Sequence, residues 1–219
     1  MTPHDPVPGV FADRREAGRL LGGRLEREDL GPAVVLGLPR GGVPVAAEVA
    51  RSLGAPLDVI VVRKVGVPFH PEVAMGAIAE GGARFVDERL MARLGIGEPE
   101  FARLEVRERV TLDERVARIR ARHPAPTLTG RIAVVVDDGI ATGATAIAAS
   151  IAARDRGASL VVVAAPVVST DAVPRIARHA DRVIGVLEPD DLGAVGVYYL
   201  RFDPTSDAEV DALLEGRDV

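Results

Sequence analysis

The sequence predicts an α/β fold, a doubly wound and mainly parallel β-sheet flanked by helices. Uninterrupted apolar runs, such as residues 33–38 and 132–136, are typical of strands that are buried on both faces. Segments with apolar residues at helical spacing separate these runs, and such alternation favours a parallel sheet between two layers of helices. At 219 residues, we expect a single domain over 1–219 with its core at about 30–187.

The elements are expected in a regular order. Residues 11–27 have Ala17, Leu20, Leu21 and Leu25 at helical spacing, which predicts an amphipathic first helix. A less regular region is expected over 65–97, with short strands near 77–79 and 84–86. The other predicted elements are strand 33–38, helix 43–53, strand 57–62, strand 131–137, helix 144–156, strand 159–165, helix 171–179 and strand 182–187.

A helical insertion is predicted over about 98–122. This stretch is dense in charge and has only a partial apolar stripe, so we expect a long and largely exposed helix. Its arginines allow a nucleic-acid-binding face as one interpretation. The glutamates interleaved with them favour a solvated, ion-paired surface instead, and no nucleic-acid partner is expected.

Composition excludes several classes of function. The chain has no cysteine, which excludes disulfides, thiolate metal sites and cysteine nucleophiles and fits a reducing compartment. The net charge of −5 weighs against a general nucleic-acid binder. No apolar run approaches membrane-spanning length and no apolar leader follows the first residues, so we expect a cytoplasmic protein with no membrane partner.

The most informative stretch is IAVVVDDGIATGAT, residues 132–145. A buried strand ends in Asp137 and Asp138, and a short loop from Gly139 to Thr145 then opens a helix. Free backbone N–H groups at a helix start bind anions, whereas carboxylates accept hydrogen bonds from sugar hydroxyls or bind a metal. A phosphorylated sugar would satisfy both parts. The alternative is an ordinary strand–turn–helix connection.

Two other strand ends carry positive charge. Of the 27 basic residues 26 are arginine, so the single lysine, Lys64, is conspicuous beside Arg63 at the end of an apolar run. Earlier in the chain, Arg40 is the only charge in a glycine-rich turn, where Gly41 and Gly42 allow a ligand to approach the backbone closely. Ligands bind at such strand ends in doubly wound sheets.

These motifs together resemble the type I phosphoribosyltransferases, which use phosphoribosyl pyrophosphate (PRPP). The D-D-x-x-x-T-G-x-T pattern resembles their ribose-phosphate signature, although Ala144 stands where the family usually has glycine. L-P-R-G-G-V-P-V-A, V-V-R-K-x-G-x-P and E-V-A-M-G-A-I-A extend the resemblance over about 11–210, to a little-characterised group of predicted phosphoribosyltransferases.

The resemblance implies roles for individual residues. Asp137 and Asp138 would hold the ribose hydroxyls, and Arg40, Arg63 and Lys64 would neutralise the departing pyrophosphate. Mg²⁺ would be the cofactor, held mainly by PRPP itself and at most by the two aspartates. The resemblance makes the glycine-rich turn a pyrophosphate loop and the stretch 139–145 a phosphate loop. The remaining substrate-binding candidates lie in these two loops: Gly41, Gly42, Gly139, Ala141, Thr142, Gly143, Ala144 and Thr145.

The resemblance also implies a small C-terminal hood over about 188–205 that receives the acceptor base. Leu192 and Tyr198 are its candidate contacts, and ordinary packing of these side chains is an equally open interpretation. Family analogy further implies a homo-oligomer, often a dimer.

Two functions are compatible with these residues. The first is transfer of the phosphoribosyl group from PRPP to an unidentified base-like acceptor. The second is a non-catalytic PRPP-sensing module on the same fold, because fold alone does not determine function. The three cations on the pyrophosphate side favour turnover, since a sensor needs affinity alone.

Overall fold

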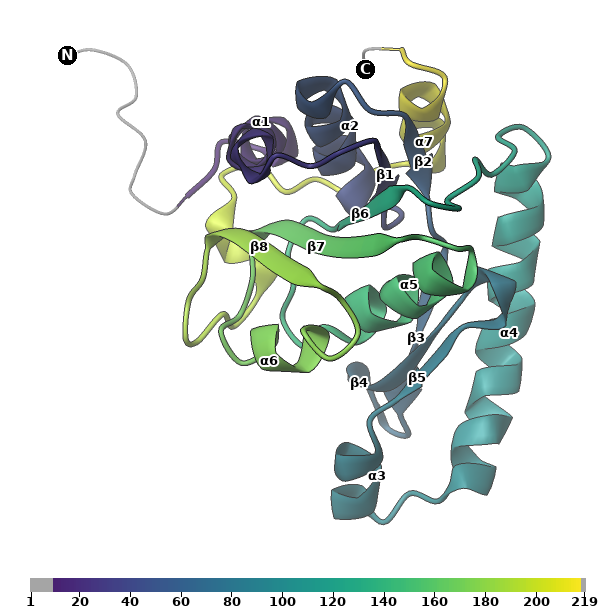
Figure 1. The fold of residues 1–219 in the computed structure, drawn as a ribbon. Coiled ribbons are helices and arrows are strands. Elements are labelled where there is room, and N and C mark those ends of the chain that lie inside the picture. The colour runs from purple at the N-terminus through teal and green to yellow at the C-terminus, as the bar shows by residue number, and fades with distance from the viewer. Residues whose placement is uncertain (1–9, 218–219) are drawn as a thin grey trace.

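The central feature of the computed structural model, which describes residues 10–217, is a parallel sheet covered by helices (Figure 1). Each neighbouring pair of its strands is parallel. The strand order is β2-β1-β6-β7-β8, formed by Leu57–Val59, Ala33–Gly37, Ile132–Val136, Leu160–Val167 and Arg182–Leu187. The predicted fold class is confirmed.

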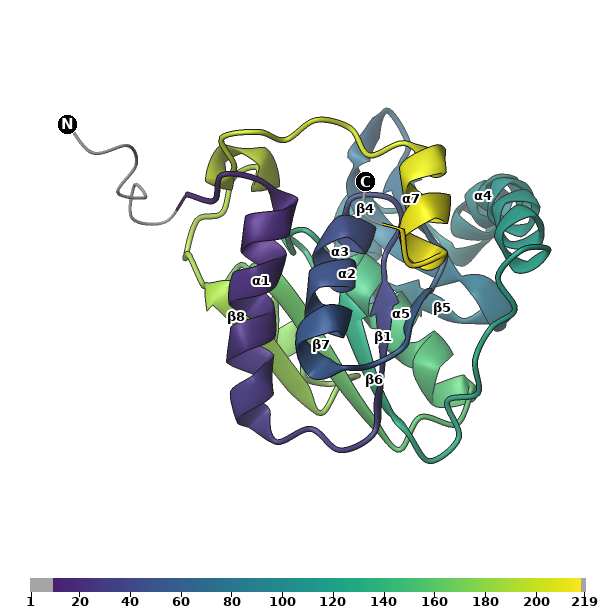
Figure 2. The same cartoon turned by 90° about the horizontal axis from the view of Figure 1, so that it is seen from above.

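Apolar packing on both faces explains the uninterrupted strand sequences. The helices that cover the sheet are α1 (Arg14–Leu25) and α2 (Gly42–Leu53) on one face, and α5 (Ala144–Asp155) and α6 (Val173–Ile176) on the other (Figures 1 and 2). Successive side chains of a strand point to opposite faces. Val35 and Val134 therefore pack with α1 and α2, whereas Val34 and Val135 pack with α5.

A second, antiparallel sheet lies beside the first, in the order β3-β4-β5. It is formed by Val62–Val67, His70–Ala79 and Arg84–Val86. The prediction of one strand over 57–62 was wrong, because β2 ends at Val59 and β3 begins a different sheet at Val62. The side chains from Val59 to Val61 are all fully buried, so the apolar pattern gave no sign of the change of sheet.

Two further helices pack on this antiparallel unit. Helix α4 (Glu98–Arg120), close to its predicted length, buries Phe101, Leu112 and Ile119 in the same apolar cluster as Val65 of β3. The expectation of a largely exposed helix therefore holds only for its outer side. Helix α7 (Asp207–Leu214), which was not predicted, adds to this cluster and lies beside α4 (Figure 2).

The segment expected to form the hood crosses the N-terminal end of α1. Phe11 packs with Leu192 and Tyr199, and its N–H donates to the carbonyl oxygen of Tyr198 at 2.8 Å. The short elements are the 3₁₀ turns η1 (Glu26–Glu28), η2 (Glu80–Gly82) and η3 (Val195–Tyr198) and helix α3 (Glu88–Leu94). Within residues 10–217, no helix is both long enough and apolar enough to span a bilayer.

Candidate active site

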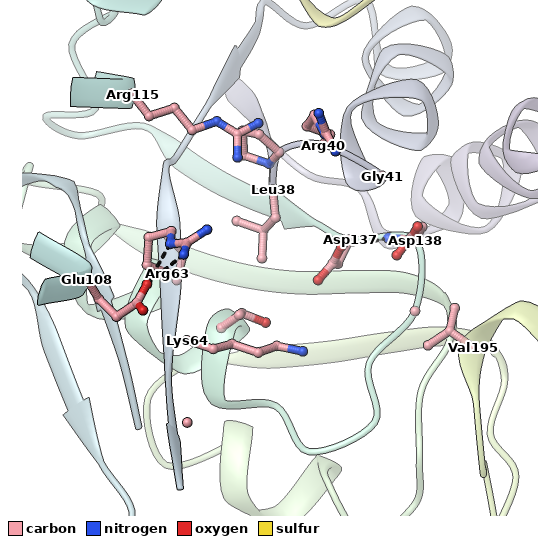
Figure 3. A pocket seen from close by; sticks show the side chains of 15 residues that line it. Leu38, Arg40, Gly41, Arg63, Lys64, Glu108, Arg115, Asp137, Asp138 and Val195 are labelled. Carbon is pink, nitrogen blue, oxygen red and sulfur yellow. Dashed lines mark hydrogen bonds and ion pairs between the residues drawn. The ribbon is translucent and has the colours of Figure 1, made fainter. Parts of the chain in front are cut away.

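The strand-end loops meet around one cavity at the carboxyl edge of the parallel sheet. Strands β1 and β6 are neighbours with Gly37 opposite Val136, so the loops that follow them start side by side. The N–H of Leu38 donates to the carbonyl oxygen of Val136 at 2.8 Å. The cavity holds about 500 Å³ (Figure 3) and is lined by Leu38, Pro39, Arg40, Gly41, Val62, Arg63, Lys64, Gly66, Glu108, Arg115, Asp137, Asp138, Gly139, Thr145 and Val195.

The glycine-rich turn lies directly against the acidic pair. A Cβ atom added to Gly41 would lie 2.1 Å from Oδ2 of Asp138, and one added to Gly42 would lie 2.7 Å from the carbonyl oxygen of Val136. Only glycine leaves room for the Asp138 side chain beside residue 41 and for the backbone of β6 beside residue 42. The peptide bond between Pro39 and Arg40 is cis.

The two aspartates have different surroundings. Oδ2 of Asp138 accepts a hydrogen bond from Nε of Arg14 at 2.8 Å, which forms an ion pair. Oδ1 of Asp137 accepts from the N–H of Asp138 at 2.9 Å. Burial, followed by the charge of Asp138, raises the pKa of Asp137 well above its usual range, and Lys64 opposes this shift. Asp137 is therefore the carboxyl group that a cationic or hydrogen-bonding ligand would ionise.

A hydroxyl group holds the main chain of the acidic pair. The hydroxyl of Tyr199 donates to the carbonyl oxygen of Asp138 at 2.5 Å. Burial, followed by the charge of Asp138, raises the pKa of Tyr199, so the phenol stays protonated and keeps its role as donor. The C-terminal segment thus orients the strand end that carries both acids.

Strand β3 brings two cations to the opposite wall. The side chain of Lys64 extends across the cavity toward Asp137 (Figure 3). Both Nε and Nη2 of Arg63 donate to Oε2 of Glu108 on α4, at 2.9 and 2.6 Å. The ammonium group of Lys64 has no ion-pair partner among residues 10–217, so it is available to a ligand.

The predicted phosphate loop leads into helix α5. Gly143 has φ of +81°, a conformation that glycine adopts without strain, and it precedes the helix without any side-chain cap. The first N–H groups of α5 are therefore free of a side-chain acceptor. Thr145 lines the cavity. Ala141 and Thr142 are exposed and, like Gly143, are not among its lining residues, and the methyl group of Ala144 is buried in the core.

The hood candidates lie elsewhere. Leu192 is 5% exposed and packs with Phe11, while Tyr198 is half-buried, and neither lines the cavity. Val195 reaches the cavity from this segment instead. A Cβ atom added to Gly139 would lie 2.3 Å from the Val195 side chain, so the acidic loop contacts the segment that was expected to form the hood.

Several site residues escaped the sequence analysis. Arg14 is one of several arginines on α1, and nothing in the sequence distinguishes it from the others. Glu108 and Arg115 were assigned to an exposed helix surface, yet both line the cavity. Their spacing of seven residues, two helical turns, places them on one side of α4 and is the signal that could have identified them.

Comparison with known proteins assigns the chain to a family. The model of the phosphoribosyl transferase domain matches residues 14–200. A Mycobacterium tuberculosis H37Rv protein, named provisionally as a phosphoribosyl transferase, is 50% identical over 206 residues, which cover 94% of this chain. The chain spans 46% of that relative's length.

Solved structures agree with the fold. The crystal structure of TT1426 from Thermus thermophilus has a TM-score of 0.79 and 45% identity, covering 94% of this chain and 97% of that one. The structure of AQ2163 from Aquifex aeolicus has a TM-score of 0.52 at 11% identity, covering 92% and 83%, and shows the fold alone. The chain therefore belongs to the phosphoribosyl transferase domain family.

Proposed function

We propose that this protein transfers the 5-phosphoribosyl group from PRPP to a nitrogenous base or similar acceptor and releases pyrophosphate. One observation carries the proposal: a single cavity brings two carboxylates and an uncapped helix start together with the cations Arg40, Arg63 and Lys64. These groups complement the hydroxyls, the 5′-phosphate and the diphosphate of one PRPP molecule.

The reaction is a substitution at the anomeric carbon of the ribose. The bond from C1 to the diphosphate oxygen breaks, and its electron pair leaves with the diphosphate. The lone pair of the acceptor nitrogen forms the new bond to C1, and the acceptor releases its N–H proton to water. Positive charge develops on the sugar and negative charge on the leaving group, as at other glycosidic centres.

The residues of the chain act by position and charge. Asp137 accepts hydrogen bonds from the ribose hydroxyls, and these bonds together with Lys64 favour its ionised form. The ion pair with Arg14 fixes the Asp138 side chain beside it. Arg40, Arg63 and Lys64 stabilise the charge that grows on the diphosphate.

Magnesium fits this cavity as a partner of the substrate. No cluster of three or more potential metal-binding side chains occurs within residues 10–217. Asp137 and Asp138 could each add one oxygen to a cation that the diphosphate oxygens hold, which is how Mg²⁺ commonly binds. When bound, Mg²⁺ would neutralise part of the diphosphate charge.

The acceptor, the location and the assembly stay predictions. Val195 and Gly139 form the hood side of the cavity, where we expect the acceptor to approach C1. A cytoplasmic protein that forms homo-oligomers is our expectation.

The test compares the wild type with a double variant, Asp137→Asn and Asp138→Asn. We expect wild-type protein with PRPP and Mg²⁺ to release pyrophosphate when a suitable purine, pyrimidine or amine is present. The double variant should lose both PRPP binding in calorimetry and pyrophosphate release. Asp113→Asn with Asp155→Asn, which neutralises two exposed carboxylates instead, is the matched control and should retain both.

The PRPP sensor is the second candidate. It would bind PRPP as tightly as an enzyme, yet no acceptor of a broad panel would stimulate pyrophosphate release. The set of three cations around the leaving group favours the enzyme. If the double aspartate variant still binds PRPP like the wild type, the assignment of the carboxylates is wrong for both candidates.

A further inference from the structure

A second hollow, partly lined by helix α4, adjoins the arginine end of the cavity. This hollow holds about 510 Å³ and shares Arg40, Arg63 and Arg115 with the first cavity. The rest of its lining is Thr111, Glu114, Arg118 and Asp207. Positive groups therefore dominate the side of the site that faces away from the hood.

A single carboxylate, that of Asp207, forms ion pairs with three guanidinium groups in this hollow. Asp207, the first residue of α7, lies 3.9 Å from Nη1 of Arg40 and 3.4 Å from Nη2 of Arg115. Its other oxygen lies 2.8 Å from Nη2 of Arg118. Two of the three contacts are longer than a good charged hydrogen bond, so one carboxylate cannot satisfy all three cations.

Arg115 is the least satisfied member of this group. Its side chain is only 18% exposed, and its Nε is buried without a hydrogen-bond partner among residues 10–217. Burial, followed by the charges of Arg40, Arg118 and Arg63, lowers the pKa of Arg115, while Asp207 opposes the shift. A buried cation without enough acceptors is costly unless a ligand supplies them.

The neighbouring acids do not remove this excess. Glu108 is already engaged by Arg63, and Glu114 is exposed at the rim. Figure 3 shows Arg40, Arg63 and Arg115 around one end of the cavity, with Asp137 and Asp138 farther along it. The arrangement suits a ligand that is neutral and hydroxylated at one end and multiply anionic at the other.

Building on the proposed function, we infer that Arg40, Arg115 and Arg118 form the diphosphate subsite and that Asp207 occupies it until the diphosphate displaces it. Diphosphate offers several oxygens where the carboxylate offers two, so it can satisfy the planar donors of three guanidinium groups together. The Asp207 carboxylate of helix α7 thus competes with the diphosphate for the three arginines, and the substrate displaces it on binding.

Asp207→Asn tests the competition. The amide keeps the shape of the side chain but removes the charge that competes with the ligand. We expect binding of inorganic pyrophosphate, measured by calorimetry, to tighten about fivefold or more. Asp211→Asn is the matched control, because Asp211 lies on the same helix but pairs with Arg122, outside the hollow. Its affinity should equal that of the wild type.

Arg115→Gln tests the subsite itself. We expect pyrophosphate and PRPP to bind about tenfold more weakly or worse, because a charged hydrogen-bond donor is lost. Ribose 5-phosphate, which lacks the diphosphate, should bind as it does to the wild type and so reports that the variant is folded. Arg122→Gln is the control for loss of a guanidinium group. If Arg115→Gln fails to fold, Asp207→Asn decides alone.

The outcomes separate this inference from the proposed function. PRPP binding that is unchanged in both Asp207→Asn and Arg115→Gln overturns the inference and leaves the proposed function intact. A wild-type protein that binds ribose 5-phosphate but no pyrophosphate overturns the inference as well. A wild-type protein that binds neither PRPP nor pyrophosphate overturns both.

Discussion

The site has two walls that differ in how the chain builds them. The parallel-sheet wall comes from two short stretches that follow neighbouring strands, residues 38–41 and 137–139, and from Thr145 at the start of α5. The antiparallel wall combines β3, α4 and α7, and its contacts join residues as far apart as Arg40 and Asp207. A local motif can specify the first wall, whereas the second exists only after distant segments have packed.

The two walls also differ in electrostatics. Asp137 and Asp138 share the first wall with free helical N–H groups. Burial, followed by the charge of Asp138, raises the pKa of Asp137. The second wall is an arginine cluster with too little negative charge of its own. Each wall is incomplete alone, and a ligand with hydroxyls and phosphates would satisfy both.

The largest effect on stability is expected from a variant that loosens the antiparallel wall. Phe101→Ala removes a fully buried ring that anchors α4 to the antiparallel sheet. We expect a loss of about 3–5 kcal/mol in the free energy of unfolding, measured in urea. Because Glu108 and Arg115 lie on the same helix, PRPP binding should weaken more than ribose 5-phosphate binding. Val106→Ala, at an exposed position on α4, should change stability by less than about 0.5 kcal/mol.

An equal loss of affinity for both ligands in Phe101→Ala would show that α4 does not contribute selectively to the diphosphate end. In that case the two walls would act as one unit in ligand binding.

A smaller effect is expected in the first wall. Gly42→Ala would put a methyl group against the backbone at Val136 and Asp137, which cannot move aside easily. We expect about 1–3 kcal/mol of destabilisation and impaired binding of both PRPP and ribose 5-phosphate. Gly23→Ala is the control, since a methyl group there meets nothing within 4 Å. That variant should gain about 0.5–1 kcal/mol.

The hydrogen bond from Tyr199 to Asp138, which joins the C-terminal segment to the first wall, can be removed by deleting one hydroxyl group. Tyr199→Phe removes the hydroxyl that donates to the carbonyl oxygen of Asp138. We expect a loss of about 1 kcal/mol in stability and a weaker hold on ribose 5-phosphate. Tyr198→Phe is the matched control, and thermal unfolding of the two variants provides the measurement. Equal melting temperatures would exclude a role for the Tyr199 hydroxyl.

Unlike the other site variants, Asp137→Asn is expected to raise the melting temperature. The pKa of Asp137 is higher in the folded protein than in the unfolded chain, because of burial and Asp138. The folded state therefore binds more protons, and it loses stability as pH rises from the usual carboxyl range through the raised pKa. We expect Asp137→Asn to melt at a higher temperature than the wild type near neutral pH, by a margin that shrinks as the pH falls toward about 4.

Melting curves at several pH values check this last expectation. A difference between Asp137→Asn and the wild type that is constant with pH would mean that Asp137 titrates normally. Asp155→Asn, at an exposed position, provides the reference for the effect of removing one carboxylate.

The sequence alone determined the parallel core and the first wall. Buried strands read as unbroken apolar runs, and the acids, glycines and threonines of the loops follow them directly, so local order was sufficient. Arg63 and Lys64 line the cavity, but their predicted place at a strand end was wrong: they lie inside β3, because the break between β2 and β3 at residues 60 and 61 left no trace in the apolar pattern.

Only the tertiary structure decided what completes the site. Arg14, Glu108, Arg115 and Asp207 lie on three helices whose arginines and acids look like ordinary solvated surface in the sequence. Charged side chains carry no periodic signal that separates a cavity wall from an exposed face. Their role arises because packing of apolar side chains such as Phe101 and Val210 brings the helices over the strand ends.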